Sequence, residues 1–190
     1  NPPRNFWEAL QLIWLADLAF ALEGRGAMSY GRMDQYLYPF YKRDIDRGDL
    51  TYEQALLLIE HFYAKLGEPM RVNPINNISV GGLTPQGEDG TNDLSFILLK
   101  AANTIRSPRH NLTARWHSGT PEAFKEECFE LIRTGIGFPA IVNDDVLSRG
   151  LLRLGYPPED ARNYCFVGCI ETFFPGKTGP WADSRLNMLK

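Results

Sequence analysis

The feature that most constrains the fold of this chain is an alternation between helical patterns and short apolar runs. Helical patterns cover residues 6–23, 55–65, 91–104 and 120–135. Short segments with the composition of buried strands cover residues 77–80, 111–116, 139–142 and 164–167. Strands that alternate with helices of this length are typical of βαβ units, in which successive strands lie parallel. The sequence therefore predicts an α/β fold with a mainly parallel sheet.

Capping signals indicate where several helices begin. Thr51 and Gln54 have the spacing of a capping box in front of the second helix. Thr120 is predicted as the N-cap of the fourth helix, because Pro121 suits the first helical position. The segment 6–23 has apolar residues along much of its length and is predicted to be a long, well-buried helix.

Length and charge exclude several classes of protein. The 190 residues match one domain, and the formal net charge of −3 comes from well-mixed acidic and basic residues. Such a balance does not favour nucleic acid or a membrane surface as a partner. No apolar run approaches the ~20 residues that a spanning helix needs, and the first residues lack the pattern of a signal peptide. We expect a cytoplasmic protein.

The cysteines are too few for a disulfide scaffold. Cys128, Cys165 and Cys169 are expected to be reduced thiols. Cys165 and Cys169 lie four residues apart, which is not a usual zinc spacing. We therefore predict no metal site, and Cys165 is interpreted as a packing residue.

The most unusual segment is 163–177, where a short apolar run ends in Gly168-Cys169-Ile170-Glu171. On an extended backbone, side chains two residues apart point to the same side, so Cys169 and Glu171 would face one cavity. A thiol and a general base facing one cavity can act on the same substrate. The spacing alone more often indicates a core cysteine beside a glutamate that is paired with Arg or Lys.

The motif Gly168-Cys169-Ile170-Glu171 resembles the thiyl radical site of the glycyl radical enzymes, the pyruvate formate-lyase-like family. Other segments are similar to segments of that family and occur in the same order: residues 29–39, 77–82, 111–117 and 137–145. The resemblance therefore covers essentially the whole chain.

The resemblance implies that residues 1–190 are the central fragment of a ten-stranded β/α barrel and part of a single catalytic barrel domain. In this family the cysteine lies on a loop inside the barrel and faces a second loop that carries the glycyl radical. No motif of that second loop occurs in the sequence, so the C-terminal glycyl radical domain is expected to be absent. We accordingly expect no cofactor bound to this chain, which would be inactive alone. The complete protein is expected to be a homodimer whose radical is installed by a radical-SAM activating enzyme.

Residues 171–183 are most similar to the glycerol and propanediol dehydratase branch of the family. The resemblance places Asp183 where that branch has an aspartate that contacts substrate hydroxyls. Gly26 and Ala27 stand at substrate-binding positions where the branch has a His-Ser pair. Losing two hydroxyl-binding side chains disfavours glycerol itself as the substrate.

The resemblance implies a radical lyase, and most simply a dehydratase that eliminates water from a small hydroxylated substrate. Cys169 would abstract hydrogen, Glu171 would act as the base, and Asp183 would bind or protonate the leaving group. Acyl transfer of the pyruvate formate-lyase type, which uses adjacent cysteines, is disfavoured because Gly168 precedes Cys169. Two alternatives stay open: a lyase that cleaves a carbon-nitrogen, carbon-sulfur or carbon-carbon bond, and a non-catalytic α/β binding protein.

Overall fold

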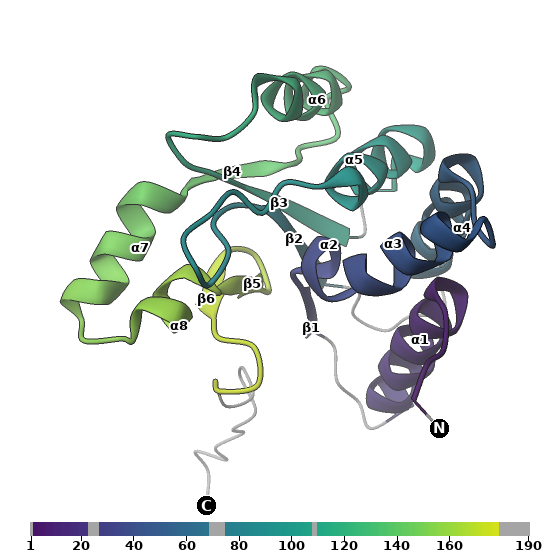
Figure 1. The fold of residues 1–190 in the computed structure, drawn as a ribbon, viewed down its shortest axis with the longest axis horizontal. Helices are drawn as coiled ribbons and strands as arrows, with labels where there is room; N and C mark the ends of the chain where they lie inside the picture. Colours follow the sequence, from purple (N-terminus) through teal and green to yellow (C-terminus); the bar gives the residue numbers. More distant parts are fainter. Residues whose placement is uncertain (1, 23–26, 69–74, 108–109, 179–190) are drawn as a thin grey trace, which may run out of the picture.

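The structure is a computed structural model that describes residues 2–22, 27–68, 75–107 and 110–178 (Figure 1). The helices are α1 (Phe6–Leu22), α2 (Met33–Tyr36), α3 (Tyr38–Arg47), α4 (Tyr52–Leu66), α5 (Asp93–Ile105), α6 (Glu122–Arg133), α7 (Asp144–Arg153) and α8 (Pro158–Arg162). The strands are β1 (Ala27–Gly31), β2 (Ile75–Gly81), β3 (His110–Trp116), β4 (Ala140–Asn143), β5 (Cys165–Val167) and β6 (Glu171–Phe173).

The main sheet has four strands in the order β1-β2-β3-β4, and every neighbouring pair is parallel. The predicted α/β fold with a parallel sheet is thus confirmed. The strand predicted at residues 164–167 also forms, as β5, but it does not join this sheet. It pairs antiparallel with β6 in a separate hairpin. Figure 1 shows that hairpin on the side of the sheet away from α5 and α6.

The two faces of the central strands differ in chemistry, because side chains alternate along a strand. The face toward the helices is apolar and fully buried, and includes Ile78, Val80, Leu112 and Ala114. The face toward the hairpin carries Asn77, Ser79, Asn111, Thr113 and Arg115, which follow the same period of two. The parallel sheet therefore presents a polar inner face to the β5–β6 hairpin.

The capping predictions are confirmed for one helix and shifted for another. At α4 both bonds of the capping box between Thr51 and Gln54 form. At α6 the N-cap is Pro121, so the prediction of Thr120 was wrong by one residue. The reason is that the Thr120 hydroxyl accepts a hydrogen bond from the His117 N–H at 2.8 Å, so this hydroxyl serves the preceding loop instead.

Helix α1 is less buried than its composition predicts. Its first turn is anchored, since the buried Phe6 N–H donates to Asp44 Oδ2 at 2.6 Å. Further along, large apolar side chains face outward, with Leu15 60% and Leu22 89% exposed. The prediction of a well-buried helix was wrong, because no element among the described residues covers this outer face of α1.

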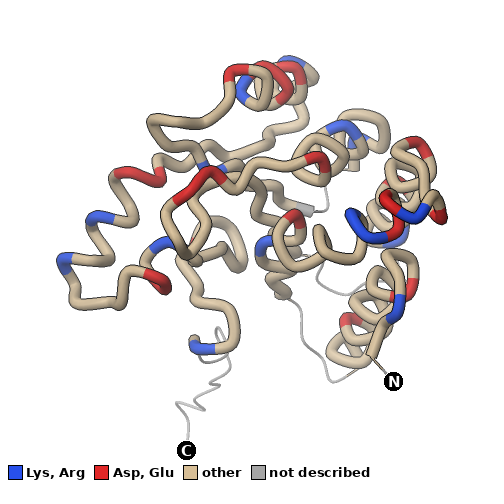
Figure 2. Tube along the Cα trace, viewed as in Figure 1, with Lys and Arg blue, Asp and Glu red and all other residues tan. Residues whose placement is uncertain are grey.

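Charged side chains lie mainly on the outer helices. Figure 2 shows acidic and basic residues mixed along α3, α4 and α6. Such mixing agrees with the small net charge, and the described residues of these helices form no basic stripe of the kind found in nucleic-acid-binding proteins. None of the helices in the described ranges has the length and hydropathy of a membrane span.

Candidate active site

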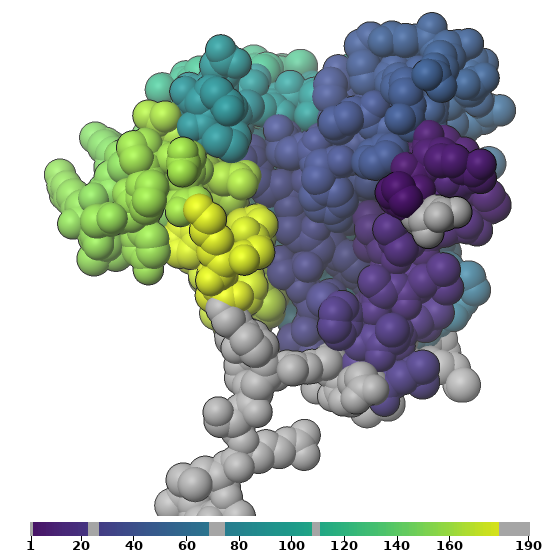
Figure 3. Space-filling view, turned by 60° about the horizontal axis from the view of Figure 1, so that its bottom comes forward, coloured from purple at the N-terminus to yellow at the C-terminus, as the bar shows by residue number. Residues whose placement is uncertain are grey.

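The Cys169 motif forms the turn of the β5–β6 hairpin. Residues 168–170 are the turn, and Val167 and Glu171 are the strand pair that closes it. Cys169 is exposed at the tip and Glu171 is half-buried. The prediction of an extended backbone at Cys169 was therefore wrong, although both side chains still belong to one tight loop. Figure 3 shows the hairpin and the residues after it, in yellow, reaching the molecular surface.

Side-chain amides of the sheet hold the peptide groups next to Cys169. The Asn77 amide donates to Cys169 O at 3.0 Å and also lies 3.4 Å from Gly168 O. The Asn111 amide donates to Gly168 O at 3.0 Å. Carbonyls in a tight turn lack the partners that a strand ladder supplies, so these side chains satisfy them.

Two serines hold the β5 strand in the same way. The Ser29 hydroxyl donates to Phe166 O at 2.6 Å, and the Phe166 N–H donates to Ser79 Oγ at 3.2 Å. Cys165 is buried beside them, with its sulfur 3.6 Å from Ser29 Oγ, and burial raises the pKa of the Cys165 thiol. Cys165 is thus a packing residue, as the sequence predicts. Ser29 on β1 and Ser79 on β2 therefore bind the backbone C=O and N–H of the same residue, Phe166.

A fully buried ion pair anchors the chain that enters the hairpin. Arg115 on β3 binds Asp144 at the start of α7 through two parallel bonds, of 2.8 and 2.9 Å. The remaining guanidinium N–H groups donate to Tyr164 O and Arg162 O, both at 2.7 Å. Leaving either charge unpaired is costly, so the pair holds Arg115 in place. Arg115 in turn holds the backbone of residues 162 and 164.

Tyr164 and Gly82 pack directly against the ion pair. The Arg115 guanidinium lies 3.8 Å from the centre of the Tyr164 ring, and the Tyr164 hydroxyl donates to Asp144. Burial raises the pKa of Tyr164, so this group stays a donor. Gly82 has a φ of +79°, and a Cβ there would lie 2.7 Å from both charged side chains. The glycine therefore leaves the room that the pair occupies.

The carboxylate of Glu171 folds back over the turn that carries Cys169. The Ile170 N–H donates to Glu171 Oε2 at 3.0 Å. Gly168 lies directly below, with a φ of +59°, and a Cβ at Gly168 would lie 2.7 Å from Glu171 Oε2. The missing side chain of Gly168 thus creates the seat of the carboxylate and explains why glycine precedes the cysteine.

Replacing Gly168 with Ala is expected to displace this carboxylate. An L-residue at this φ costs about 1–2 kcal/mol, and the new Cβ takes the place of Glu171 Oε2. Gly176 offers a matched control, because its φ of +70° is similar but its Cβ would meet nothing within 4 Å. Denaturant unfolding should show similar losses for Gly168→Ala and Gly176→Ala. Turnover by the full-length protein should fall about 10²-fold in Gly168→Ala alone, because a displacement of about 1 Å costs about that much in rate. Equal turnover in both variants would contradict the role of Gly168 in leaving room for the Glu171 carboxylate.

The other predicted site residues are placed only in part. Asp183 and Gly26 lie outside the described residues. Ala27 begins β1, is half-buried and pairs with Ile75. It lies two residues before Ser29, on the face that meets the hairpin. Within the described ranges, no group of three or more His, Cys, Asp and Glu side chains could hold a metal ion.

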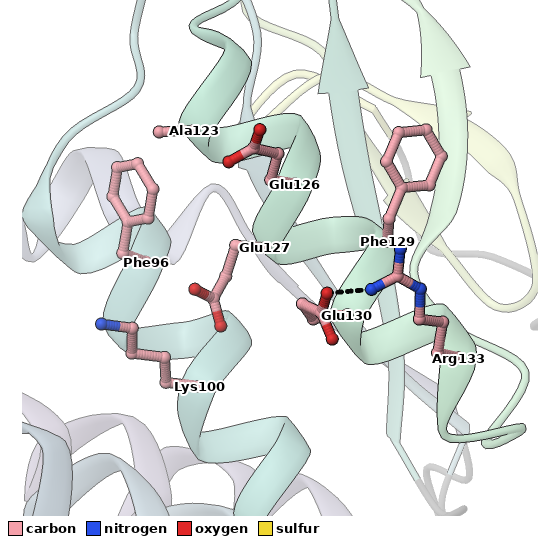
Figure 4. A pocket seen from close by; sticks show the side chains of 8 residues that line it. All are labelled: Phe96, Lys100, Ala123, Glu126, Glu127, Phe129, Glu130 and Arg133. Atoms are coloured by element: carbon pink, nitrogen blue, oxygen red, sulfur yellow. Dashed lines mark hydrogen bonds and ion pairs between the residues drawn. The ribbon is translucent and has the colours of Figure 1, made fainter.

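A surface pocket of about 540 Å³ lies on the other side of the sheet, between α5 and α6 (Figure 4). Its walls include Phe96, Lys100, Glu127 and Phe129. Burial raises the pKa of Glu127, and the nearby Lys100 lowers it. Because this pocket is on the outer helical layer, it is separate from the Cys169 loop.

Sequence reasoning missed the side chains that hold the loop. Asn77 on β2, and Asn111 and Arg115 on β3, lie on the face of their strands opposite the buried apolar residues. Polar residues at a period of two within buried strands are a recognisable signal, because each must find a hydrogen-bond partner there. That signal predicts a polar partner on one face of the sheet, but it does not identify the hairpin.

The fold and this loop define an α/β domain that presents a cysteine from its polar inner face. The family model described as pyruvate formate lyase-like matches residues 1–190, and the chain belongs to that family of glycyl radical enzymes. This result confirms the resemblance drawn from the Gly-Cys-x-Glu motif. The neighbouring structures are barrels of this family, so the α/β unit is consistent with a fragment of a β/α barrel.

Individual relatives are similar over almost the whole chain. A probable dehydratase, YbiW, of Escherichia coli is 36% identical over 94% of this chain and 24% of its own length. The (2S)-3-sulfopropanediol dehydratase of Klebsiella oxytoca is 36% identical over 96% of the chain and 24% of its own length. A solved structure on 1,2-propanediol dehydration in Roseburia inulinivorans has a TM-score of 0.87 and 38% identity, over 95% of this chain and 24% of its own. The chain therefore spans 24% of the length of these relatives.

Proposed function

We propose that the complete protein is a radical-dependent lyase, and that this chain supplies the thiol that removes hydrogen from the substrate. One observation carries the proposal: the 168–170 turn presents Cys169 at its tip and holds the Glu171 carboxylate over the same turn. A thiol and a carboxylate on one rigid loop can act on adjacent atoms of one bound molecule.

The proposed reaction begins at Cys169. Its thiyl form takes a hydrogen atom from a carbon that bears a hydroxyl group, so an S–H bond forms and a C–H bond breaks. Glu171 then removes the hydroxyl proton, which gives a ketyl radical. This radical expels the hydroxyl group of the neighbouring carbon, and the leaving group takes a proton and departs as water. The product radical takes its hydrogen atom back from the Cys169 thiol, which restores the thiyl form.

Dehydration is the favoured elimination because the relatives at 36–38% identity are named for it, whereas isethionate sulfite-lyases match at 32–35%. Two of them concern the dehydration of a propanediol or of a sulfopropanediol. We propose a small hydroxylated substrate for this protein, with Asp183 binding or protonating the leaving hydroxyl. Gly26 and Ala27 would leave space beside the substrate rather than bind it, which disfavours glycerol.

The proposed reaction needs a glycyl radical close enough to Cys169 to take the hydrogen atom of its thiol. A glycyl radical, when installed, supplies the acceptor that generates the thiyl form of Cys169. We place it on a segment outside residues 1–190 and propose that a radical-SAM activating enzyme installs it. The exposed position of Cys169 at the tip of the hairpin leaves the thiol accessible to such a segment. We further propose that the complete protein is a cytoplasmic homodimer. It should work only without oxygen, because oxygen quenches carbon radicals.

The test is anaerobic expression of the full-length protein with an activating enzyme, followed by a screen for elimination. Diols, amino alcohols and hydroxysulfonates are offered as substrates, and the glycyl radical is quantified by electron paramagnetic resonance. Dehydration of a diol is expected, and Glu171→Gln should keep the radical signal but slow turnover by about 10²-fold or more. Release of an amine or of sulfite instead would favour the alternative carbon-nitrogen or carbon-sulfur lyase. A protein that acquires no radical and eliminates nothing would be the non-catalytic alternative.

A further inference from the structure

The two asparagines that face the hairpin bind both peptide groups around Cys169. The carbonyl of Gly168 belongs to the peptide before Cys169, and the carbonyl of Cys169 belongs to the peptide after it. Asn111 Nδ2 lies 3.0 Å from the first oxygen, and Asn77 Nδ2 lies 3.0 Å from the second. Asn77 also reaches the first oxygen, at 3.4 Å. Each side of the cysteine is therefore tied to a different strand.

The Asn77 amide is itself held in place. Asn77 is fully buried, and its Oδ1 accepts a hydrogen bond from Thr113 Oγ1 at 3.2 Å. Because the oxygen of this amide is occupied, its NH₂ group is held toward the turn. Asn77 and Asn111 are also direct neighbours in the parallel register of β2 and β3. The pair thus lies side by side on two hydrogen-bonded strands of the parallel sheet, beneath the turn.

Fixing two consecutive peptide groups fixes the residue between them. Each peptide is planar, so the orientations of the two planes determine φ and ψ at Cys169. The direction of the Cα–Cβ bond follows from these angles, and so does the region that the sulfur can reach. A hydrogen transfer depends steeply on alignment, and a shift of about 1 Å costs roughly 10²-fold in rate.

We propose that Asn77 and Asn111 are positioning residues for the Cys169 thiol, which set the direction from which its sulfur approaches the C–H bond of the substrate. The inference rests on the proposed radical function. It assigns a role to two segments, 77–82 and 111–117, that resemble the family without containing its reacting groups. Their asparagines act on the reaction through the backbone of residues 168 and 169.

The experiment uses the full-length protein, activated anaerobically, with the variants Asn77→Leu, Asn111→Leu and Asn77→Asp. Asn103→Leu is the matched control, because Asn103 is a half-buried asparagine on α5 whose side chain binds Arg106. Three quantities are measured: the glycyl radical content, kcat and KM separately, and hydrogen exchange of the 164–173 backbone by mass spectrometry.

We expect both leucine variants to keep the radical content and KM of the parent but to lose about 10²-fold in kcat, with faster exchange in 164–173. Asn77→Asp supplies a second check, since a buried carboxyl favours its neutral form, which can donate to a carbonyl. Its kcat relative to the parent should rise as pH is lowered, whereas the ratio for Asn77→Leu should not change. A simple loss of packing would not produce this dependence on pH.

If Asn77→Leu and Asn111→Leu keep the kcat and the hydrogen exchange of the parent protein, the inference is overturned. An active parent protein would still support the proposed function in that case. Equal losses in Asn103→Leu would overturn it as well. If Asn77→Leu fails to fold, Asn77→Asp decides, because a kcat ratio that is flat with pH contradicts the role. A parent without radical or turnover overturns the proposed function and the inference together.

Discussion

Replacing Cys169 with Ala is expected to abolish turnover in the full-length protein while leaving the glycyl radical in place. The thiol is the group that exchanges hydrogen with the substrate in the proposed reaction, and the methyl group of Ala cannot replace it. Removing a group that forms the reactive centre costs up to ~10⁶-fold in other enzymes, so the rate should fall below detection. Substrate loss and the radical signal are measured on the same anaerobic sample.

Cys165→Ser is the matched control for this experiment. Cys165 is a second thiol in the same hairpin, but it is buried and its sulfur lies 3.6 Å from Ser29 Oγ. A hydroxyl keeps that contact and nearly the same volume, so turnover should persist. Full activity of Cys169→Ala, or loss of activity in Cys165→Ser alone, would show that the wrong cysteine has been assigned.

Replacing Arg115 with Met is expected to be strongly destabilising, because it leaves one side of a buried ion pair without its partner. The substitution leaves Asp144 buried with the hydroxyl of Tyr164 and the N–H of Leu83 as its remaining partners. Breaking one side of a buried ion pair costs about 3–5 kcal/mol. The backbone of Tyr164 also loses a donor, so the Cys169 hairpin should loosen as well. Denaturant unfolding followed by circular dichroism measures the loss.

Two further variants separate the charge from the packing. Arg115→Met combined with Asp144→Asn removes the unpaired carboxylate and should recover part of the lost stability. Arg133→Met removes an arginine from the exposed pair with Glu130 and should change stability little. A loss for Arg115→Met no larger than that for Arg133→Met would show that the buried pair does not hold this part of the fold.

The sequence predicts the parallel sheet well, because short strand-like runs that alternate with helical patterns along the chain are a strong local signal. Segments 77–80, 111–116 and 139–142 all became strands of one sheet. Two shorter strands escaped prediction. Residues 27–31 lack a clear apolar alternation and are mostly half-buried, and residues 171–173 are too short for any period to show. Their pairing depends on distant partners rather than on local pattern.

The candidate site is predicted less completely, because its parts meet only through the tertiary fold. The four-residue motif predicts Cys169 and Glu171 as the catalytic residues, and their roles stay predictions, whereas the family model confirms the family that the motif resembles. Local pattern could not join Arg115 to Asp144, which lies 29 residues further along the chain. That contact arises because β3 and β4 are neighbours whose carboxyl ends meet at one edge. The roles of Asp183 and Gly26 stay predictions, since both lie outside the described residues.

The inner face of the sheet holds the hairpin by side-chain tips rather than by a strand ladder, and this has an evolutionary consequence. The distance between the loop and the sheet is set by the lengths of Ser29, Ser79, Asn77 and Asn111. Exchanging one of these residues for a longer or shorter polar residue would raise or lower the loop without changing the hydrogen bonds between strands. Substitutions at these four positions could therefore shift the reactive thiol relative to the sheet, so that related proteins could act on substrates of different size.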